Sequence, residues 1–272
     1  MRLADFLKRR LISPQLDQEL ARMARPAGSL GYDPWGYHYG TVKYSYLAIR
    51  ELYHKYFRVT VDGIDRIPAE GPVIIVANHS GQLPIDGLLI GFALASRSRR
   101  PRLPRAMIDR FSPTMPYLGN LLNRLGGVPD DPVSCARLLA NGEAIIIFPE
   151  GVRGAGKPYR ERYQLKRFST GFMRLAMEHN ATIVPVGVIG CEETIPSLTN
   201  IAPLARLLGL PYFPLAAPVI LPAKVNLLVG DPLEFNQVAH SEQQIAAQVQ
   251  QVRTSLEALI AKGLERRRGV FL

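Results

Sequence analysis

The sequence predicts an α/β fold, in which a central mixed, largely parallel β-sheet is flanked by helices and preceded by an N-terminal amphipathic helical pair. Short apolar segments of strand length alternate with helical segments along most of the chain. Two of them, residues 73–77 (VIIVA) and 144–148 (AIIIF), are apolar at every position. Strands that are apolar on both faces are typical of a sheet that helices cover on both sides, because neither face meets water.

The remaining elements follow from the same alternation. They are strands at 58–63 (RVTVDG), 183–189 (IVPVGVI) and 224–229, and helices at 86–95, 168–179 and 241–268. The last helix starts from a favourable N-cap, Ser241, with Gln244 three residues further on in the pattern of a capping box. Its basic end, Glu265-Arg-Arg-Arg268, suits the negative pole of a helix dipole.

Residues 1–57 precede this alternating region, which gives a division into 1–57 and 58–272. The first part predicts two amphipathic, basic helices, with a turn-rich loop at 28–36 (GSLGYDPWG) between them. Such helices are suited to a membrane–water interface. Packing against the sheet domain is the alternative, and the sequence does not choose between the two.

Composition limits the partners and the compartment. The 272 residues carry a formal net charge of +10, which favours anionic partners. No nucleic-acid recognition module is recognisable, so a membrane surface or a phosphorylated substrate is expected instead. Cys135 and Cys191 stand in no metal-binding pattern, which predicts no metal site and a reducing, cytoplasmic environment. The charged first residues do not predict a signal peptide, and no apolar run reaches the roughly 18 residues of a membrane span.

A first group of candidate site residues follows the strand at 73–77, where loops of α/β sheets bind ligands. Asn78, His79, Ser80 and Gly81 lie in this loop, and Asp86 opens the next helix. A histidine whose tautomer is fixed by a carboxylate is suited to act as a general base. Without further information, a helix cap with a hydrogen-bonded histidine in the turn explains the same residues.

A second group follows the strand at 144–148, where Glu150, Gly151 and Arg153 stand in the segment FPEGVRG. Arginine binds phosphate through two parallel hydrogen bonds, although a Glu–Arg pair that braces a loop is the simpler explanation. A basic stretch, 160–167, contains Lys166 and is by itself a solvated loop. The segment 184–187 (VPVG) interrupts a strand with proline.

Taken together and in order, these blocks resemble the glycerolipid acyltransferase superfamily, which includes the lysophosphatidic acid and glycerol-3-phosphate acyltransferases. The resemblance covers about residues 59–230, and the Phe-Pro-Glu-Gly-x-Arg block is its most specific part. It implies an enzyme without metal or cofactor that uses acyl-CoA or acyl carrier protein as co-substrate. The roles that it implies are general base for His79 assisted by Asp86, acceptor and phosphate binding for Glu150, Gly151, Arg153 and Lys166, and support from Asn78, Ser80 and Gly81.

Two features depart from the family pattern. Six residues separate His79 from Asp86, where the family has four, so the connecting loop must be longer. The second block of the family ends in an arginine that contacts the acceptor phosphate, but here Gly127-Val128 runs into Pro129-Asp130-Asp131. This loss weakens the case for lysophosphatidic acid and leaves other lysophospholipids, lipoamino acids or a neutral alcohol as acceptors.

The expected reaction is direct transfer of a fatty acyl group from the thioester to a lipid hydroxyl, without an acyl-enzyme. Backbone N–H groups near the turns at Gly81 or Gly151 are expected to stabilise the oxyanion. One alternative is an esterase or thioesterase with Ser80 or Ser169 as nucleophile, although neither serine lies in a GxSxG elbow. Another is a non-catalytic protein of the membrane surface.

The expected partners are an acyl thioester donor, which includes acyl carrier protein, a lipid acceptor and an anionic membrane surface. The protein is expected to be cytoplasmic and peripheral at the inner face of the membrane. The apolar, proline-broken segment 207–223 is a loop that meets the membrane or covers the acyl pocket. The sequence does not specify the acceptor, the acyl chain length, the donor or the oligomeric state.

Overall fold

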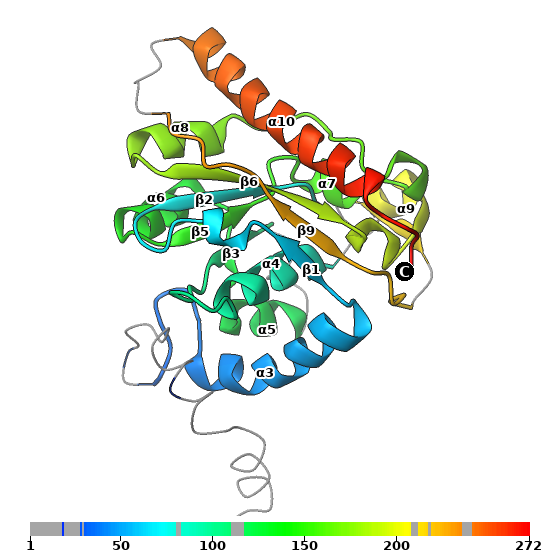
Figure 1. Cartoon of the computed structure of the whole chain (residues 1–272), viewed down its shortest axis with the longest axis horizontal. Coiled ribbons are helices and arrows are strands. Elements are labelled where there is room, and N and C mark those ends of the chain that lie inside the picture. Colours follow the sequence, from blue (N-terminus) through cyan, green and yellow to red (C-terminus); the bar gives the residue numbers. More distant parts are fainter. Residues whose placement is uncertain are drawn as a thin grey trace, which may run out of the picture.

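The computed structural model describes residues 18, 28, 30–79, 83–109, 117–207, 212–216, 219–235 and 241–272 (Figure 1). The first helix of the expected N-terminal pair lies outside the described residues. The second is α3 (Tyr39–Glu51), which continues into one π-helical turn, Leu52–Tyr56. Tyr46 and Tyr53 of this segment pack on the ring of Phe92, with ring centroids 4.8 and 4.7 Å from it. The described helix is therefore packed on the sheet domain.

A seven-stranded sheet in the order β1-β9-β6-β2-β5-β3-β4 forms the centre of the molecule (Figure 1). Its strands are β1 (Thr60–Asp62), β2 (Val73–Ala77), β3 (Arg105–Ile108), β4 (Val128–Pro129), β5 (Ala144–Ile147), β6 (Thr182–Ile189) and β9 (Asn226–Val229). Every neighbouring pair is parallel except β6 and β9. The expected mixed, largely parallel sheet is thus confirmed. Two further strands, β7 (Ser197–Asn200) and β8 (Pro214–Ala216), form a separate antiparallel pair.

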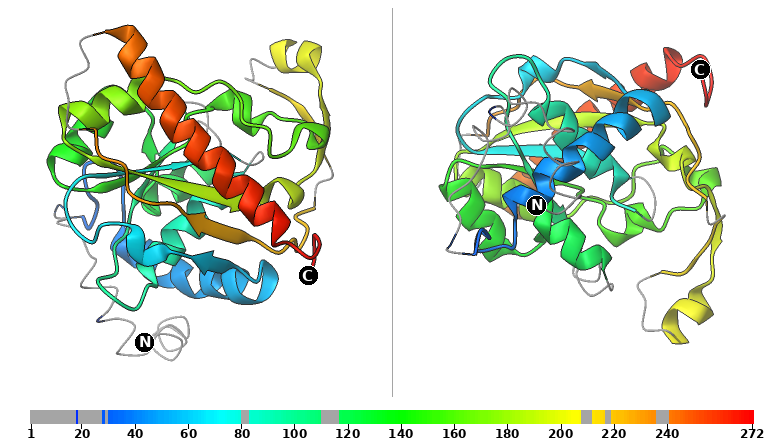
Figure 2. Two further views of the ribbon diagram at one scale, coloured as in Figure 1. Left: turned by 45° about the horizontal axis from the view of Figure 1, so that its top comes forward. Right: turned by 90° about the horizontal axis from the view of Figure 1, so that it is seen from below.

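Helices cover both faces of the sheet, as Figure 2 shows from two further sides. The remaining helices are α4 (Ile85–Ala95), α5 (Leu118–Arg124), α6 (Pro132–Ala140), α7 (Val152–Ala155), α8 (Gly171–Glu178), α9 (Ala202–Leu207) and α10 (Glu242–Glu265), with short 3₁₀ turns at Ile64–Arg66, Tyr159–Glu161 and Cys191–Glu193. Alternate side chains of β2 enter different cores: Val73 and Ile75 pack with α4, whereas Ile74 and Val76 pack with α6, α8 and α10. A fully apolar strand is required because both of its faces are buried.

Most predicted elements lie within a few residues of their observed bounds. The strand at 73–77 is β2 without any change, and the final helix begins after its Ser241 cap, where the capping box with Gln244 is present. The sequence did not indicate β3, which begins with Arg105. A charged residue at the start of a buried strand conceals the apolar signal.

The side chain of Arg105 is only 1% exposed and is held by acidic and aromatic groups. Its guanidinium forms ion pairs with Asp33 and, at 3.2 Å, with Glu143, and it lies over the rings of Trp35 and Tyr37. The other oxygen of Asp33 accepts the backbone N–H groups of Trp35 and Tyr37. Arg105 therefore fixes the loop that leads into α3.

Among the described residues, no helix combines the length and the apolar character that crossing a bilayer requires.

We predict that Arg105→Met lowers the free energy of unfolding by about 3–5 kcal/mol, because Asp33 and Glu143 lose their cation. Thermal unfolding followed by circular dichroism measures the loss. The control is Arg160→Met, which removes a guanidinium whose side chain is 81% exposed and should change stability by less than about 0.5 kcal/mol. Equal losses in the two variants would show that burial of the Arg105 pair is not what stabilises this loop.

Candidate active site

The candidate site begins where β2 ends. Asn78 is fully buried, and its side-chain amide makes two hydrogen bonds to one residue of the neighbouring strand β6: it donates to the carbonyl of Val188 (2.9 Å) and accepts the N–H of Val188 (2.7 Å). This pair fixes the end of β2 against β6. The direction in which the chain enters the loop at His79 is thereby set.

His79 and Asp86 meet, although six residues separate them. Nδ1 of His79 lies 2.7 Å from Oδ2 of Asp86, and the side chain of Asp86 is fully buried. The other carboxylate oxygen, Oδ1, accepts the backbone N–H of Gly87 (2.7 Å) in the first turn of α4, where a negative charge is favourable. A carboxylate only accepts hydrogen bonds, so Nδ1 carries the proton and Nε2 keeps its lone pair.

The charges around His79 adjust its pKa in opposite directions. Burial acts to lower the pKa, because it disfavours the charged imidazolium. Asp86, through its charge and its hydrogen bond, and Glu150, through its charge, act to raise it, while the Lys157 ammonium acts to lower it. The balance raises the pKa of His79 above its ordinary value. The imidazole is thus a stronger base than histidine in water.

Glu150 connects the loop after β2 with the loop after β5. Its side chain is almost completely buried, and its two oxygens accept different backbone N–H groups: Oε1 that of His79 (3.0 Å) and Oε2 that of Lys166 (2.7 Å). Lys157 Nζ lies 3.4 Å from the same Oε2. The carboxylate therefore holds the backbone at His79 and joins it to the backbone at Lys166.

A buried cation balances two buried carboxylates behind His79. Besides Glu150, the ammonium of Lys157 contacts Oε1 of Glu192 (3.2 Å), whose Oε2 accepts the N–H of Tyr163 (3.0 Å). Burial raises the pKa of Glu192, and the nearby Lys157 only partly opposes this effect. Lys157 and Glu192 did not emerge from the sequence, because they meet only through the packing of separate loops.

Two glycines allow the loop after β5 to approach His79. Gly151 has φ 57° and ψ −146°, a conformation that is essentially restricted to glycine. A Cβ at Gly154 would lie 2.7 Å from Cβ of Glu150 and 3.0 Å from Cβ of His79. The ring of Phe148, at the end of β5, stacks on the imidazole with a centroid distance of 4.4 Å. The spacing of the FPEGVRG segment is thus explained by close packing around the histidine.

His79 opens into a pocket at the carboxyl edge of the sheet. The described residues that line the pocket include apolar side chains, the ring of Tyr212 and the carboxylates of Asp109 and Asp130, but no lysine or arginine. Burial, with Asp109 and Asp86 nearby, raises the pKa of Tyr212 to about 12, so its phenol is neutral at physiological pH. Among the described residues, no three His, Cys, Asp or Glu side chains are grouped so that they could hold a metal ion.

The other predicted site residues lie at different distances from this pocket. Arg153 is exposed beside a neighbouring cleft, and its guanidinium donates to the carbonyl of Arg167 (3.3 Å). The ammonium of Lys166 pairs with Glu161, so its backbone N–H, bound to Glu150, is its link to the site. The N–H of Gly151 donates to the carbonyl of Phe148 (2.9 Å) and is not available to an oxyanion. Ser80 and Gly81 lie outside the described residues.

Comparison with known proteins agrees with this geometry. Residues 58–189 match the family model described as Acyltransferase. An uncharacterized protein of Mycobacterium leprae (strain TN) is 35% identical over 237 residues, which are 82% of this chain and 65% of that protein. The "DGAT1/2-independent enzyme synthesizing storage lipids" of Homo sapiens is 26% identical over 207 residues, which are 74% of this chain and 60% of that protein. The chain thus spans less than two thirds of the length of these relatives.

One solved structure shares the fold. The crystal structure of the 1-acyl-sn-glycerophosphate (LPA) acyltransferase PlsC from Thermotoga maritima superposes with a TM-score of 0.54, covering 94% of this chain and 97% of that chain at 18% identity. At this identity the likeness concerns the fold alone. The family model covers the blocks around His79 and Glu150, so residues 58–189 belong to the acyltransferase family, and the likeness to PlsC agrees with this in fold.

We predict that kcat/KM for acyl transfer rises with pH through the pKa of His79, because only the neutral imidazole accepts a proton. Asp86→Asn removes the charge and the hydrogen bond that raise this pKa, so the acidic limb should move to lower pH. The plateau should also fall, because asparagine no longer fixes the tautomer. The measurement is the pH–rate profile of both proteins.

The control for this profile is Glu161→Gln, since Glu161 pairs with Lys166 and not with His79. Its acidic limb should coincide with that of the wild type. An unchanged limb in Asp86→Asn would contradict the assignment of Asp86 as the group that raises the pKa.

Proposed function

We propose that this protein transfers a fatty acyl group from a thioester, acyl-CoA or acyl-loaded acyl carrier protein, to the hydroxyl of a lipid, with His79 as general base. One observation carries the proposal: the imidazole of the His79–Asp86 pair opens into a pocket that adjoins a mainly apolar cavity. A base beside a space for a hydrocarbon chain is what acyl transfer to a lipid requires.

In the proposed reaction, Nε2 of His79 takes the proton of the acceptor hydroxyl while the hydroxyl oxygen attacks the thioester carbonyl. The resulting tetrahedral oxyanion collapses to the ester, and the C–S bond breaks. The thiolate that leaves takes the proton from the imidazolium, which restores neutral His79. Asp86 stabilises the positive charge on the ring between these steps, and Asn78 and Glu150 hold the backbone on which the ring stands.

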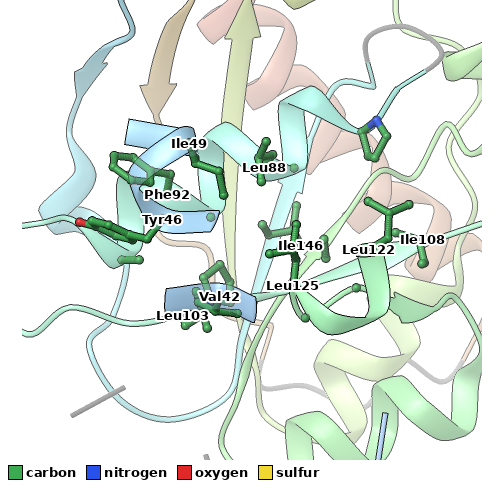
Figure 3. A pocket seen from close by; sticks show the side chains of 18 residues that line it. Val42, Tyr46, Ile49, Leu88, Phe92, Leu103, Ile108, Leu122, Leu125 and Ile146 are labelled. Atoms are coloured by element: carbon green, nitrogen blue, oxygen red, sulfur yellow. The ribbon is translucent and has the colours of Figure 1, made fainter. Parts of the chain in front are cut away.

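The apolar cavity is the proposed site of the acyl chain. It lies between α3, α4 and α5, and the labelled side chains in Figure 3 line it mainly from these helices, from β3 and β5 and from the segment before β3. Pro84, Ala106 and Ile108 line both this cavity and the pocket of His79, so the two spaces adjoin. A chain that lies in the cavity would keep its carbonyl carbon close to the base. Each methylene that is buried there contributes about 0.8 kcal/mol.

The acceptor is a lysophospholipid or, in the alternative, a neutral or amino-acid-bearing lipid alcohol. A phosphomonoester acceptor is disfavoured by the sequence after Gly127-Val128, which runs into Pro129-Asp130-Asp131 where the family pattern has an arginine that contacts the acceptor phosphate. Arg153 in the neighbouring cleft is the described cation best placed for a phosphodiester headgroup. The human relative is named for the synthesis of storage lipids, which also favours an acceptor without a phosphomonoester.

An esterase or thioesterase mechanism is the competing proposal. It needs a serine within hydrogen-bond reach of His79 or a water in place of the acceptor. Ser169 is exposed, its backbone N–H donates to Pro149, and no hydrogen bond joins it to His79 in the described part of the chain. Ser80 lies outside the described residues, but neither serine stands in a GxSxG elbow, so we favour transfer to a lipid hydroxyl. The substrates and the positive net charge support a cytoplasmic, peripheral position at the inner face of the membrane.

The test is thiol release from acyl-CoA and from acyl-loaded acyl carrier protein, with lysophospholipids, diacylglycerol and long-chain alcohols as acceptors. We predict acceptor-dependent release that falls by about 10²–10⁴-fold in His79→Ala, because general-base catalysis contributes this much. Circular dichroism shows whether the variant is folded. Release without any acceptor would identify a thioesterase, and a variant that keeps most of its activity would exclude His79 as the base.

We predict that Gly91→Leu shifts the preference towards shorter acyl donors. Gly91 lines the apolar cavity, and a Cβ there would meet only Pro104, at 3.9 Å, so a leucine side chain has room to enter. Excluding about three methylenes should lower kcat/KM for long relative to short donors by roughly 10–100-fold. The control is Leu88→Met, which lines the same cavity and nearly conserves volume. An unchanged preference in Gly91→Leu would place the acyl chain elsewhere.

A further inference from the structure

We propose that a projecting arm of the fold inserts into the surface of an anionic lipid bilayer. The arm consists of β7, α9, β8 and the segment 219–222, and these elements lie at one side of the molecule, beyond α7 and away from the central sheet (Figures 1 and 2). The C-terminal end of α10 lies at the same side in all views.

The arm is almost without charge. Between residues 194 and 223 the sequence contains one charged residue, Arg206, and no aspartate or glutamate. Charged residues make up 21% of the whole chain, so about six are expected in thirty residues. A surface segment that lacks charges to this degree is suited to a surrounding other than water.

Large apolar side chains of the arm are exposed. Leu198 of β7 and Leu207 of α9 are 73% and 81% exposed, and Leu215 of β8 is 47% exposed. Val219 and Ile220, on the segment 219–222 of the arm, are also exposed. These exposed residues come from every part of the arm, and burying them in a bilayer would remove apolar area from water.

Cations lie on both flanks of the arm. On one flank, β7 contacts the Tyr159–Glu161 turn, which opens the basic stretch with the exposed Arg160, Arg162 and Arg167. On the other, the arm ends beside Arg58, whose guanidinium donates to the carbonyl of Pro222 (2.7 Å). Lys224, Arg266 and Arg268 line the adjoining cleft with Asp62, the acid that Arg266 pairs with. An apolar surface between cations fits the headgroups and upper acyl region of an anionic bilayer.

The arm also reaches the candidate active site. Tyr212, which immediately precedes Phe213 and β8, lines the pocket of His79, and its ring lies beside Gly156 behind α7. A lipid surface that received Leu198, Leu207 and Leu215 would therefore be close to the pocket mouth. This inference rests on the peripheral position in the proposed function and names the surface that meets the membrane, while binding to a bilayer can be measured without the chemistry at His79.

The test is flotation of the full chain with vesicles of phosphatidylcholine that contain about a third phosphatidylglycerol, and with pure phosphatidylcholine vesicles. The arm variant replaces Leu198, Leu207 and Leu215 together by serine. The control variant replaces Leu30, Leu121 and Val133 by serine, three exposed apolar residues that lie outside the arm and its flanks. Thermal unfolding shows that each variant is folded.

We expect the wild type and the control variant to float with the anionic vesicles and the arm variant to bind at least tenfold more weakly. Weaker binding of the wild type to pure phosphatidylcholine vesicles than to anionic vesicles would show the contribution of the flanking cations. Each cation near the surface contributes about fivefold in affinity. Equal vesicle binding by the arm variant and the wild type would overturn the proposal. Absence of vesicle binding by the wild type would overturn it as well. A change in the oligomeric state of the arm variant without a change in its vesicle binding would also overturn it, and would assign the surface to a second copy of the chain.

The rate of acyl transfer with two kinds of acceptor tests this inference separately from the proposed function. The arm variant should keep the wild-type rate with a short-chain acceptor that is monomeric in water, and should lose at least tenfold with the same headgroup embedded in vesicles. An equal loss with both acceptors would overturn the membrane role of the arm. If the wild type transferred no acyl group to any acceptor, the proposed function would fail, while flotation would still decide whether the arm binds lipid.

Discussion

A carboxylate that is almost completely buried must be satisfied by protein groups, and Glu150 meets this need with the backbone N–H groups of His79 and Lys166 and the ammonium of Lys157. These contacts join the loop after β2 to the loop after β5. Most other features of the site depend on this junction. Gly154 has no side chain because Glu150 and His79 leave no room for one, and the stacking of Phe148 on the imidazole requires the two strand ends to remain in register.

With the backbone fixed in this way, the two sides of His79 serve different purposes. Asp86 occupies Nδ1 from the first turn of α4, while the pocket beyond the ring joins the apolar cavity between α3, α4 and α5. The apolar cavity lies under helices, and the pocket of His79 lies at the open edge of the sheet. Tyr212, which lies in the sequence between α9 and β8 of the arm, borders this same edge. The arm proposed to face the membrane, the pocket at the sheet edge and the cavity proposed for the acyl chain thus follow one another across the molecule.

The amino-acid pattern predicted the elements whose burial is complete on both faces. Val73–Ala77 and Ala144–Ile147 are apolar at every position, and they are the central strands β2 and β5. It did not predict β3, because Arg105 is buried only through Asp33, which comes from a loop more than seventy residues earlier, and through Glu143. Nor did it predict β7 and β8, whose exposed leucines do not show the alternation of a strand with one buried face.

The sequence by itself determined the catalytic candidates, since His79, Asp86 and Glu150 stand in segments whose order and spacing are specific. It also determined the α/β class, through local apolar runs. Tertiary structure alone decided three matters: that six intervening residues still bring Asp86 onto Nδ1, that Lys157 and Glu192 balance charge behind the site, and that Glu150 binds backbone N–H groups of two separate loops. The physical reason is that local patterns record which residues are buried. The partner of a buried charge is chosen by the packing of distant segments, and a single sequence does not record that choice.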